Sequence, residues 1–279
     1  MAQASQITSV DTQAPCVLAV DVANQITRFG LFSEDSLQAS WSIITPALIT
    51  TDEAHLAVMN FLDNIEFDCC CDEEEECCVV SFETILSCVV PDLSNTWLEA
   101  LQSMSRQRPL VVGPGIKTGL PMKYNDPSEV GSDRIADMVA SKKLFGFPLI
   151  SIDCDTTINL QVLDREGAYV GGLIVPGLSL SAKILAQTAA RLPIVELSIP
   201  ATVLGKNTRE SIQSGIIRGE AARIDGLIDM IWQELAYETT LVLSGETAAL
   251  LASLLQHEVL IDDNLTLTGL YELYKLNRK

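Results

Sequence analysis

Two apolar segments that end on an aspartate, about half a chain apart, limit the fold of this chain more than any other feature. The first covers residues 16–22 and contains Asp21, and the second covers residues 148–153 and closes on Asp153. Apolar runs of this length are typical of buried strands. A motif that recurs at such a spacing favours a duplicated domain. We therefore expect two α/β domains, at residues 15–145 and 146–279, after a flexible tail at residues 1–14.

The segments behind each aspartate agree with this organisation. Behind Asp21, the hydrophobic pattern predicts strands at 27–32, 40–45, 84–90 and 110–112, and helices at 52–62, 92–101 and 135–144. Behind Asp153, it predicts strands at 159–163, 168–174 and 241–245, and helices at 179–192, 211–234 and 264–276. Thr51 or Asp52 is expected to cap the first helix. Hairpin strands followed by alternating helices and strands are the order of an α/β half-domain.

Composition excludes several classes of partner. Of the 279 residues, 48% are hydrophobic, so the chain can bury a large core. The net charge of −19 argues against nucleic-acid backbones and anionic membrane surfaces, which attract clustered Lys and Arg. The sequence contains no apolar run of about 18 residues, the length that a spanning helix needs. The polar first residues lack the features of a signal peptide, so we expect a cytoplasmic protein.

Five of the eight cysteines lie in the acidic segment Cys69–Cys78. Adjacent cysteines have poor geometry for bridging each other. Their spacing, without a nearby His, also differs from that of zinc sites. We interpret the segment as an acidic surface hairpin with incidental thiols, with a metal or redox sensor as the alternative.

The densest group of chemically useful residues lies between positions 113 and 134. Glycines at 113, 115 and 119 precede Tyr124, and Gly131-Ser132-Asp133-Arg134 follows at the start of a predicted helix. A carboxylate is stabilised at a helix N-terminus, so Asp133 is either an ordinary capping acid or a general base that takes a hydroxyl proton. Arg134 beside it could hold a substrate carboxylate.

Asp21 is the second candidate. A strand that ends on Asp and turns into a hairpin can aim its carboxylate at a Mg²⁺ held by nucleotide phosphates. The turn at Ala23-Asn24 could then present backbone N–H groups to those phosphates. An Asp in this position is more often a simple turn starter.

The joint order of these motifs resembles the type III pantothenate kinase family along nearly the whole chain. The segments that carry the resemblance are Asp21-Val22-Ala23-Asn24, Ser87-Cys88-Val89-Val90-Pro91, Gly113-x-Gly115-x-x-Thr118-Gly119, Gly131-Ser132-Asp133-Arg134, Gly171-Gly172-x-Ile174-x-Pro176-Gly177-Leu178, Leu192-Pro193, Gly205-Lys206-Asn207-Thr208, Ser211-Ile212-Gln213-Ser214-Gly215 and Leu267-Thr268-Gly269-Leu270. The resemblance implies two actin-like domains of the sugar kinase, heat-shock and actin type, with duplicated ribonuclease H-like sheets. It also implies a homodimer, and ATP-dependent phosphorylation of pantothenate in coenzyme A biosynthesis, with Mg²⁺ and a monovalent cation, K⁺ or NH₄⁺.

The same resemblance assigns roles to individual residues. Asp133 would be the base that activates the pantothenate hydroxyl, and Asp153 would hold the monovalent cation. Asp21 would meet Mg²⁺ through ATP. The pantothenate site would consist of Tyr124, Gly131, Ser132, Arg134 and, with an offset of one position, Thr188. The phosphate-binding residues would be Asp21, Ala23, Asn24, Gln25, Arg28 and Thr156.

The nucleotide-binding motifs depart from the family pattern. Ala23 and Gln25 stand where the family has Gly and Thr, and Asp155 and Glu246 each replace a Gly. A carboxylate at position 155 would repel a phosphate by roughly 4 kcal/mol at 4 Å in an effective dielectric of about 20. The pantothenate side is nearly intact. Two hypotheses therefore stay open: a catalytic kinase with altered nucleotide or metal use, and a catalytically impaired relative that binds pantothenate as a regulator or as the partner of an intact paralogue.

Overall fold

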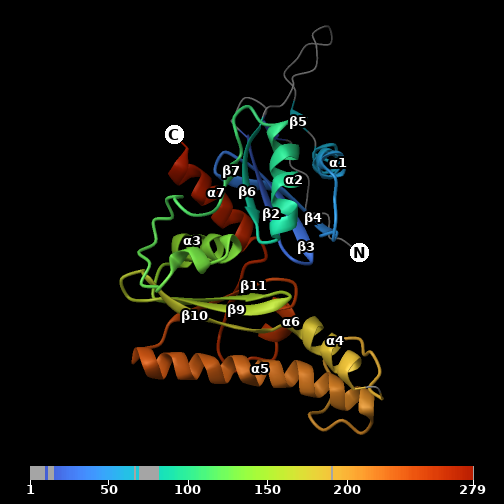
Figure 1. The fold of residues 1–279 in the computed structure, drawn as a ribbon. Helices are drawn as coiled ribbons and strands as arrows, with labels where there is room; N and C mark the ends of the chain where they lie inside the picture. Colours follow the sequence, from blue (N-terminus) through green and yellow to red (C-terminus); the bar gives the residue numbers. More distant parts are fainter. Residues whose placement is uncertain (1–9, 12–15, 66, 69–81, 190, 279) are drawn as a thin grey trace. The chain divides into compact units, whose positions relative to one another are not determined.

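The computed structural model describes residues 10–11, 16–65, 67–68, 82–189 and 191–278. The Cys69–Cys78 segment and most of the expected tail lie outside the described residues. The chain forms two compact units (Figure 1). Unit 1 contains residues 1–119, 126–140 and 266–279, and unit 2 contains residues 120–125 and 141–265. The last helix therefore belongs to the same unit as the first strands.

Unit 1 is built on a five-stranded sheet with the order β4-β3-β2-β6-β7. The hairpin strands β2 (Cys16–Val22), β3 (Ile26–Ser33) and β4 (Ser36–Ile44) are antiparallel. β6 (Phe82–Cys88) lies parallel to β2, and β7 (Leu110–Val111) lies parallel to β6. The short strands β1 (Val10–Asp11) and β5 (Phe67–Asp68) form a separate parallel pair.

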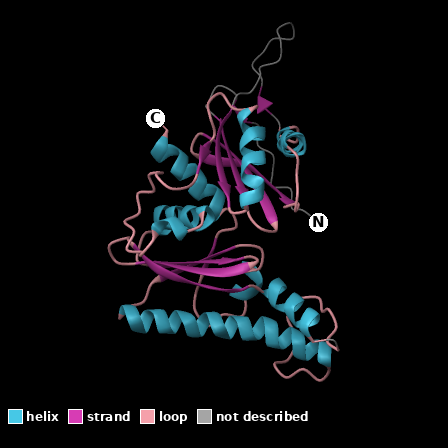
Figure 2. Cartoon of the chain, in the orientation of Figure 1, coloured by secondary structure: helices cyan, strands magenta, loops and turns pink. Residues whose placement is uncertain are grey.

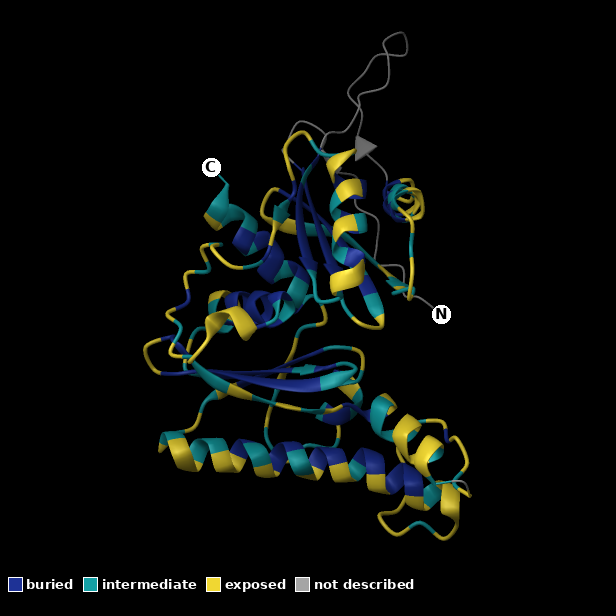
Figure 3. Ribbon diagram, viewed as in Figure 1, coloured by how far each residue is buried: buried dark blue, intermediate teal, exposed yellow. Residues whose placement is uncertain are grey.

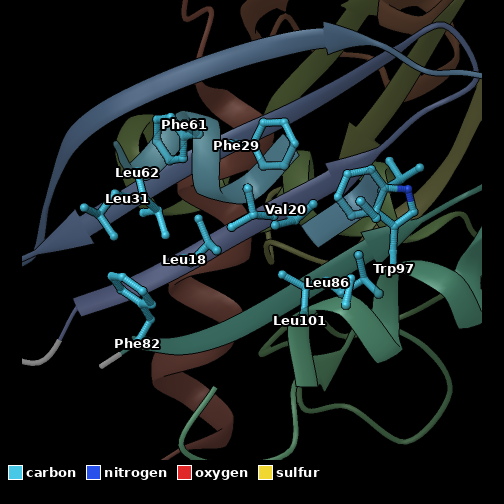
Figure 4. Packing of buried hydrophobic residues seen from close by; sticks show 14 of the residues in the cluster. Leu18, Val20, Phe29, Leu31, Phe61, Leu62, Phe82, Leu86, Trp97 and Leu101 are labelled. Carbon is cyan, nitrogen blue, oxygen red and sulfur yellow. The ribbon is translucent and has the colours of Figure 1, made fainter. Parts of the chain in front are cut away.

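One face of this sheet carries mostly apolar side chains. Leu18 and Val20 of β2 and Phe29 of β3 pack against α1 (Thr51–Leu62) and α2 (Pro91–Gln102), with Trp97 fully buried among them (Figure 4). Because successive side chains of a strand point to opposite faces, the residues between them face the other way. On that opposite face, the ring of Phe32 stacks at 4.5 Å on Tyr271 of α7 (Leu265–Asn277).

Unit 2 repeats the same sheet. Its order is β10-β9-β8-β11-β12, formed by β8 (Leu149–Cys154), β9 (Thr157–Leu163), β10 (Tyr169–Pro176), β11 (Thr240–Ser244) and β12 (Leu260–Ile261). Figure 2 draws the strands in magenta and the helices in cyan. β8, β9 and β10 are antiparallel neighbours, and β11 lies parallel to both β8 and β12. Strand order and direction thus match those of unit 1. The duplication predicted from the two strand–aspartate segments is confirmed.

The helices of unit 2 are α4 (Leu178–Thr188), the long α5 (Thr208–Leu235) and the short α6 (Ala248–Ala252). α5 buries Ile224 and Ile228 with the β8 residues Ile150 and Ile152. Figure 3 shows buried residues on the side of α5 that faces the sheet and exposed residues on the other side. Among the helices of the described residues, none has the combined length and apolar character needed to cross a membrane.

Two local expectations need correction. Thr50, and not Thr51 or Asp52, caps α1, because its side chain accepts from the backbone N–H of Glu53 while Glu53 accepts from the Thr50 N–H. This reciprocal capping box fixes the helix start one residue earlier. The short elements α6 and β12 were not predicted, because five and two residues are too few to show a hydrophobic period.

Candidate active site

The face of the unit 1 sheet opposite the apolar core carries a buried polar group. Asp21 is only 1% exposed, and its cross-strand neighbours are Arg28 on β3 and Ser87 on β6. Residues paired across strands share a face of the sheet. Asp21, Arg28 and Ser87 therefore lie side by side, on the face that α7 covers.

Helix α3 (Ser132–Phe145) begins at this polar group. The hydroxyl of Ser132 lies 2.8 Å from that of Ser87, which ties the first residue of the helix to the strand beside Asp21. The next residue is Asp133, whose Oδ1 accepts the backbone N–H of Arg134 at 2.7 Å. A Cβ at Gly131 would lie 2.5 Å from that same Oδ1. Glycine at position 131 thus leaves the space that the Asp133 carboxylate occupies.

A further acid on α3, which was not predicted from the sequence, completes the group. Asp137 stands four residues after Asp133 and is 3% exposed. Its Oδ1 accepts the hydroxyl of Thr266 at 2.6 Å. Burial raises the pKa of Asp137 well above its usual value; the Thr266 hydrogen bond and Arg28 lower it, while the charges of Asp133 and Asp21 raise it further. The available signal was the spacing of four residues, which puts two acids on one helix face.

The turn between β2 and β3 contains Ala23, Asn24 and Gln25. Its backbone is held by Thr45, whose hydroxyl donates to the Ala23 carbonyl at 2.8 Å and whose N–H donates to the Gln25 carbonyl at 2.7 Å. The side chains of Asn24 and Gln25 are exposed. Thr45 was not among the predicted residues.

The corresponding turn of unit 2 lies between β8 and β9 and contains Asp155 and Thr156. The N–H of Gly177, which precedes α4, donates to the Thr156 carbonyl at 3.0 Å. The Asp155 carboxylate accepts the backbone N–H of Glu246 at 2.6 Å. Both Asp153 and Asp155 place an Oδ1 2.8 Å from the point where a Cβ of Gly245 would stand. Gly245 has a φ of 94°, which glycine adopts without strain.

Negative charge concentrates around this second turn. The thiol of Cys154, between the two aspartates, is fully buried. Burial first, and then the charges of Asp153, Asp155 and Glu220, raise its pKa well above the usual value. Cys154 therefore stays a neutral thiol, and any anion brought to this turn meets the same unfavourable potential.

Tyr124 and Thr188 belong to unit 2 but to different parts of it. The rings of Tyr124 and Tyr169 stack with their centroids 5.2 Å apart. The backbone N–H of Lys123, next to Tyr124, donates to the Tyr169 carbonyl at 2.8 Å. Thr188 donates to the carbonyl of Ile184 at 2.7 Å within α4. It ends this helix, while Thr156 contacts its start, so about 15 Å of helix separates the two threonines.

The glycine-containing loop at 113–119 is anchored to α7. Asn277 accepts the backbone N–H of Lys117 at 2.9 Å and donates to the Lys117 carbonyl at 2.9 Å. This pair of hydrogen bonds fixes the middle of the loop in unit 1.

The carboxylates suit hard cations, which prefer oxygen ligands. Asp153 and Asp155 direct two carboxylate oxygens at one point beside Gly245, an arrangement that a cation would stabilise. Asp21, which is one carboxylate on a polar face, could reach a cation already bound to phosphates. Within the described residues, no group of three or more His, Cys, Asp or Glu side chains is arranged to hold a metal ion.

The chain is similar in fold to several solved structures. It is 17% identical to a protein from Campylobacter jejuni described as a candidate Baf family transcriptional activator, with a TM-score of 0.55 over 92% of this chain and 97% of that one. Component A of (R)-2-hydroxyglutaryl-CoA dehydratase from Acidaminococcus fermentans gives a TM-score of 0.53 at 13% identity, covering 94% and 99%. MreB 5 of Spiroplasma citri, bound to AMPPNP, gives 0.51 at 11% identity, covering 94% and 96%. The predicted class of two actin-like α/β domains is confirmed.

The sequence itself identifies the family more narrowly than the fold does. The model of the family described as type III pantothenate kinase matches residues 17–230. The match runs from β2 through most of α5 and includes Asp21, Asp133 and Asp153. On this evidence, the chain belongs to the type III pantothenate kinase family.

Proposed function

We propose that this protein transfers the γ-phosphoryl group of ATP to the terminal hydroxyl of pantothenate, giving 4'-phosphopantothenate for coenzyme A biosynthesis. The observation that carries the proposal is the position of Asp133. It lies at the N-terminus of α3, on the same polar face as Asp21, with Ser132 linked to Ser87 at 2.8 Å. A base beside a phosphate-directed acid is the arrangement that phosphoryl transfer to an alcohol requires.

In this mechanism, Asp133 accepts the proton of the pantothenate hydroxyl. The hydroxyl oxygen forms a bond to the γ-phosphorus while the bond to the β–γ bridging oxygen breaks, and ADP leaves with that oxygen. Arg28, opposite Asp21 in the sheet, is suited to offset the charge of the phosphates. Mg²⁺ held through Asp21 would supply further neutralisation.

The pantothenate molecule offers a carboxylate at the end remote from its reacting hydroxyl. Arg134 would bind that carboxylate, and Gly131 and Ser132 would line the same site. Asp153 would hold the monovalent cation. These assignments follow the family motifs and the polar positions described above.

The decisive experiment is direct detection of product. Purified protein is incubated with pantothenate, Mg-ATP and K⁺, and 4'-phosphopantothenate is measured by mass spectrometry together with ADP release. We expect stoichiometric formation of both. Absence of product with every nucleotide and divalent metal tried would rule out the kinase function.

A second function is favoured by one contact. The Asp155 carboxylate already occupies the backbone N–H of Glu246, at 2.6 Å. An anionic ligand at this turn would have to displace it and would meet its charge. A protein so arranged could bind pantothenate without ATP, as a regulatory subunit or the partner of an intact paralogue.

Calorimetry separates the two functions. Pantothenate and Mg-ATP are titrated separately into the protein at high K⁺. Binding of both supports the kinase. Binding of pantothenate alone supports the regulatory function, and failure to bind pantothenate argues against both.

The proposed assembly is a homodimer, as the family implies. Large apolar side chains are exposed in α4 and in the segment that joins it to α5, namely Ile184, Leu185, Ile194, Val203 and Leu204. Grouped exposed apolar residues are typical of surfaces that associate. We propose that this apolar surface binds a second copy of the chain.

A further inference from the structure

Asp137 is a buried acid that takes no direct part in the proposed phosphoryl transfer. We propose that Asp137 is a positioning residue that carries a proton in the folded protein, so that Asp133 is the ionised carboxylate of the pair. This inference rests on the proposed function, because it concerns the same site. It goes further by naming the residue that keeps the base in its active form.

Helix geometry brings the two acids together. Residues four apart on a helix are neighbours on one face, and both acids belong to α3. Asp137 is 3% exposed, whereas Asp133 is only partly buried. A charge costs more free energy where water is excluded. When two neighbouring carboxyl groups compete for one proton, the proton therefore stays on the more deeply buried group.

Thr266 fixes the orientation of the Asp137 carboxyl. Its hydroxyl donates to Oδ1 at 2.6 Å, which leaves Oδ2 to carry the proton. Thr266 is itself held, because α7 lies directly against α3: a Cβ at Gly269 would overlap the carbonyl of Ala136. The hydrogen bond is thus part of a rigid contact between two helices.

The charges around Asp137 come from three elements. Asp133 on α3 and Asp21 on β2 are negative, and Arg28 on β3 is positive, while α7 contributes the neutral Thr266. Burial and the two neighbouring carboxylates accordingly raise the pKa of Asp137 well above its usual value, against the smaller opposing effects of Thr266 and Arg28.

Infrared spectroscopy tests the proton directly. Spectra of the wild type and of Asp137→Asn are subtracted at neutral pH, in EDTA and without nucleotide, since a bound cation would lower the pKa of nearby carboxyls. We expect the carbonyl band of a protonated carboxylic acid in the wild type only. Identical spectra would overturn the proposal.

Turnover provides a second readout. The Asn side chain is neutral and can still accept from Thr266, so Asp137→Asn should leave the acid limb of the pH profile of kcat where it is in the wild type. Asp137→Leu, which cannot accept, should lose at least about tenfold in kcat. If Asp137 were ionised in the wild type, it would raise the pKa of Asp133. Its replacement by Asn would then move the acid limb to lower pH, and that shift would contradict the proposal that Asp137 is protonated.

Thermal unfolding as a function of pH needs no activity. The pKa of Asp137 is raised by folding, so its stabilising contribution is complete below the unfolded-state pKa and is lost as the pH rises towards the folded-state pKa. The unfolding constant of the wild type should rise relative to Asp137→Asn by up to about tenfold per pH unit in that window. If the stability of the wild type and of Asp137→Asn depended equally on pH, Asp137 would carry no proton in the folded protein.

Asp164→Asn is the control of opposite sign. Burial raises the pKa of Asp164, but Lys123 and the backbone N–H groups of Ala168 and Glu166 lower it by more. The wild type should therefore gain stability over this variant as the pH rises. If the wild type makes no 4'-phosphopantothenate, the infrared and unfolding results still decide the protonation of Asp137. If it turns over but the band is missing, this inference fails alone.

Discussion

At the residue scale, Asp133 is positioned by the two small residues before it. Gly131 has no Cβ to collide with the carboxylate, and Ser132 bonds to Ser87 and so starts α3 at the polar face. The carboxylate then accepts the N–H of Arg134. A carboxylate held in one orientation at a helix N-terminus would need little rearrangement to act as the base proposed for Asp133.

Replacement of this carboxylate tests its role as base. Asp133→Asn should lower kcat by about a hundredfold to ten-thousandfold, because Asn cannot take the hydroxyl proton. Product formation is measured by mass spectrometry and folding by circular dichroism. Asp52→Asn is the matched control, since Asp52 is also the second residue of a helix but is exposed on α1. Equal activity of the Asp133 variant and the wild type would exclude general base catalysis by this residue.

Asp155 offers a test of the nucleotide side. Asp155→Gly should tighten Mg-ATP binding by at least about tenfold, because it frees the Glu246 N–H and removes a charge that repels phosphate. Calorimetry measures the affinity. Asp155→Asn removes the charge but can still accept the Glu246 N–H. It therefore separates the repulsion of phosphate by the carboxylate from the blocking of this N–H. Weaker binding by both variants would mean that Asp155 serves to hold a cation and does not obstruct ATP.

At the scale of elements, the contact between α3 and α7 holds the polar face together. The backbones meet where Gly269 faces Ala136. Thr266 and Tyr271 of the same helix reach Asp137 and Asp35. The surroundings of Asp137 thus depend on α7, a helix that lies at the far end of the chain in sequence.

This helix contact is testable by adding one methyl group. Gly269→Ala should destabilise unit 1 by about 2 kcal/mol or more, because the added carbon has no space against α3. Gly226→Ala in α5, where the new Cβ meets open space, should instead stabilise by up to about 1 kcal/mol. Thermal unfolding of both variants gives the comparison. A Gly269 variant as stable as the wild type would show that the two helices can separate freely.

Most elements were predictable because their patterns are local. Runs such as residues 16–22 and 149–154 are mostly apolar, and each carries one aspartate near its end. Helices α1, α5 and α7 show helical spacing of their apolar residues. The short α6 and β12 were not predicted. β12 forms by pairing with β11, and α6 forms by packing its apolar side chains into the hydrophobic core of unit 2. The cap of α1 was misplaced by one residue, because Thr50, Thr51 and Asp52 are all good caps and only the reciprocal bond to Glu53 distinguishes them.

At the scale of the whole molecule, association is the property to test. Leu204→Glu should shift the protein from dimer to monomer in sedimentation equilibrium, because it puts a charge on the apolar segment after α4. Leu48→Glu is the matched control: the two leucines are 81% and 85% exposed, and Leu48 lies in unit 1. Dissociation by the Leu48 variant alone would place the interface elsewhere. A monomeric wild type would contradict the proposed homodimer.

Sequence motifs named residues in both units, and their roles stay predictions. Asp21, Ser132, Asp133 and Arg134 were all named from the order of residues, and the structure gathers them in unit 1. Asp137, Thr45 and Thr266 were not named. Thr45 and Thr266 bond partners that are distant in sequence, and Asp137 lies on a buried face of α3. No sequence motif therefore marks these residues.

The amino-acid sequence alone determines the family, the duplicated strand pattern and the acids available for chemistry, because these depend on residue identity and short-range spacing. Folding decides which acids become neighbours. Asp137 meets Thr266 across 129 positions, and Asp155 meets the Glu246 N–H across 91. Contacts of this range arise only when sheets and helices pack, and burial then determines which carboxyl keeps its proton.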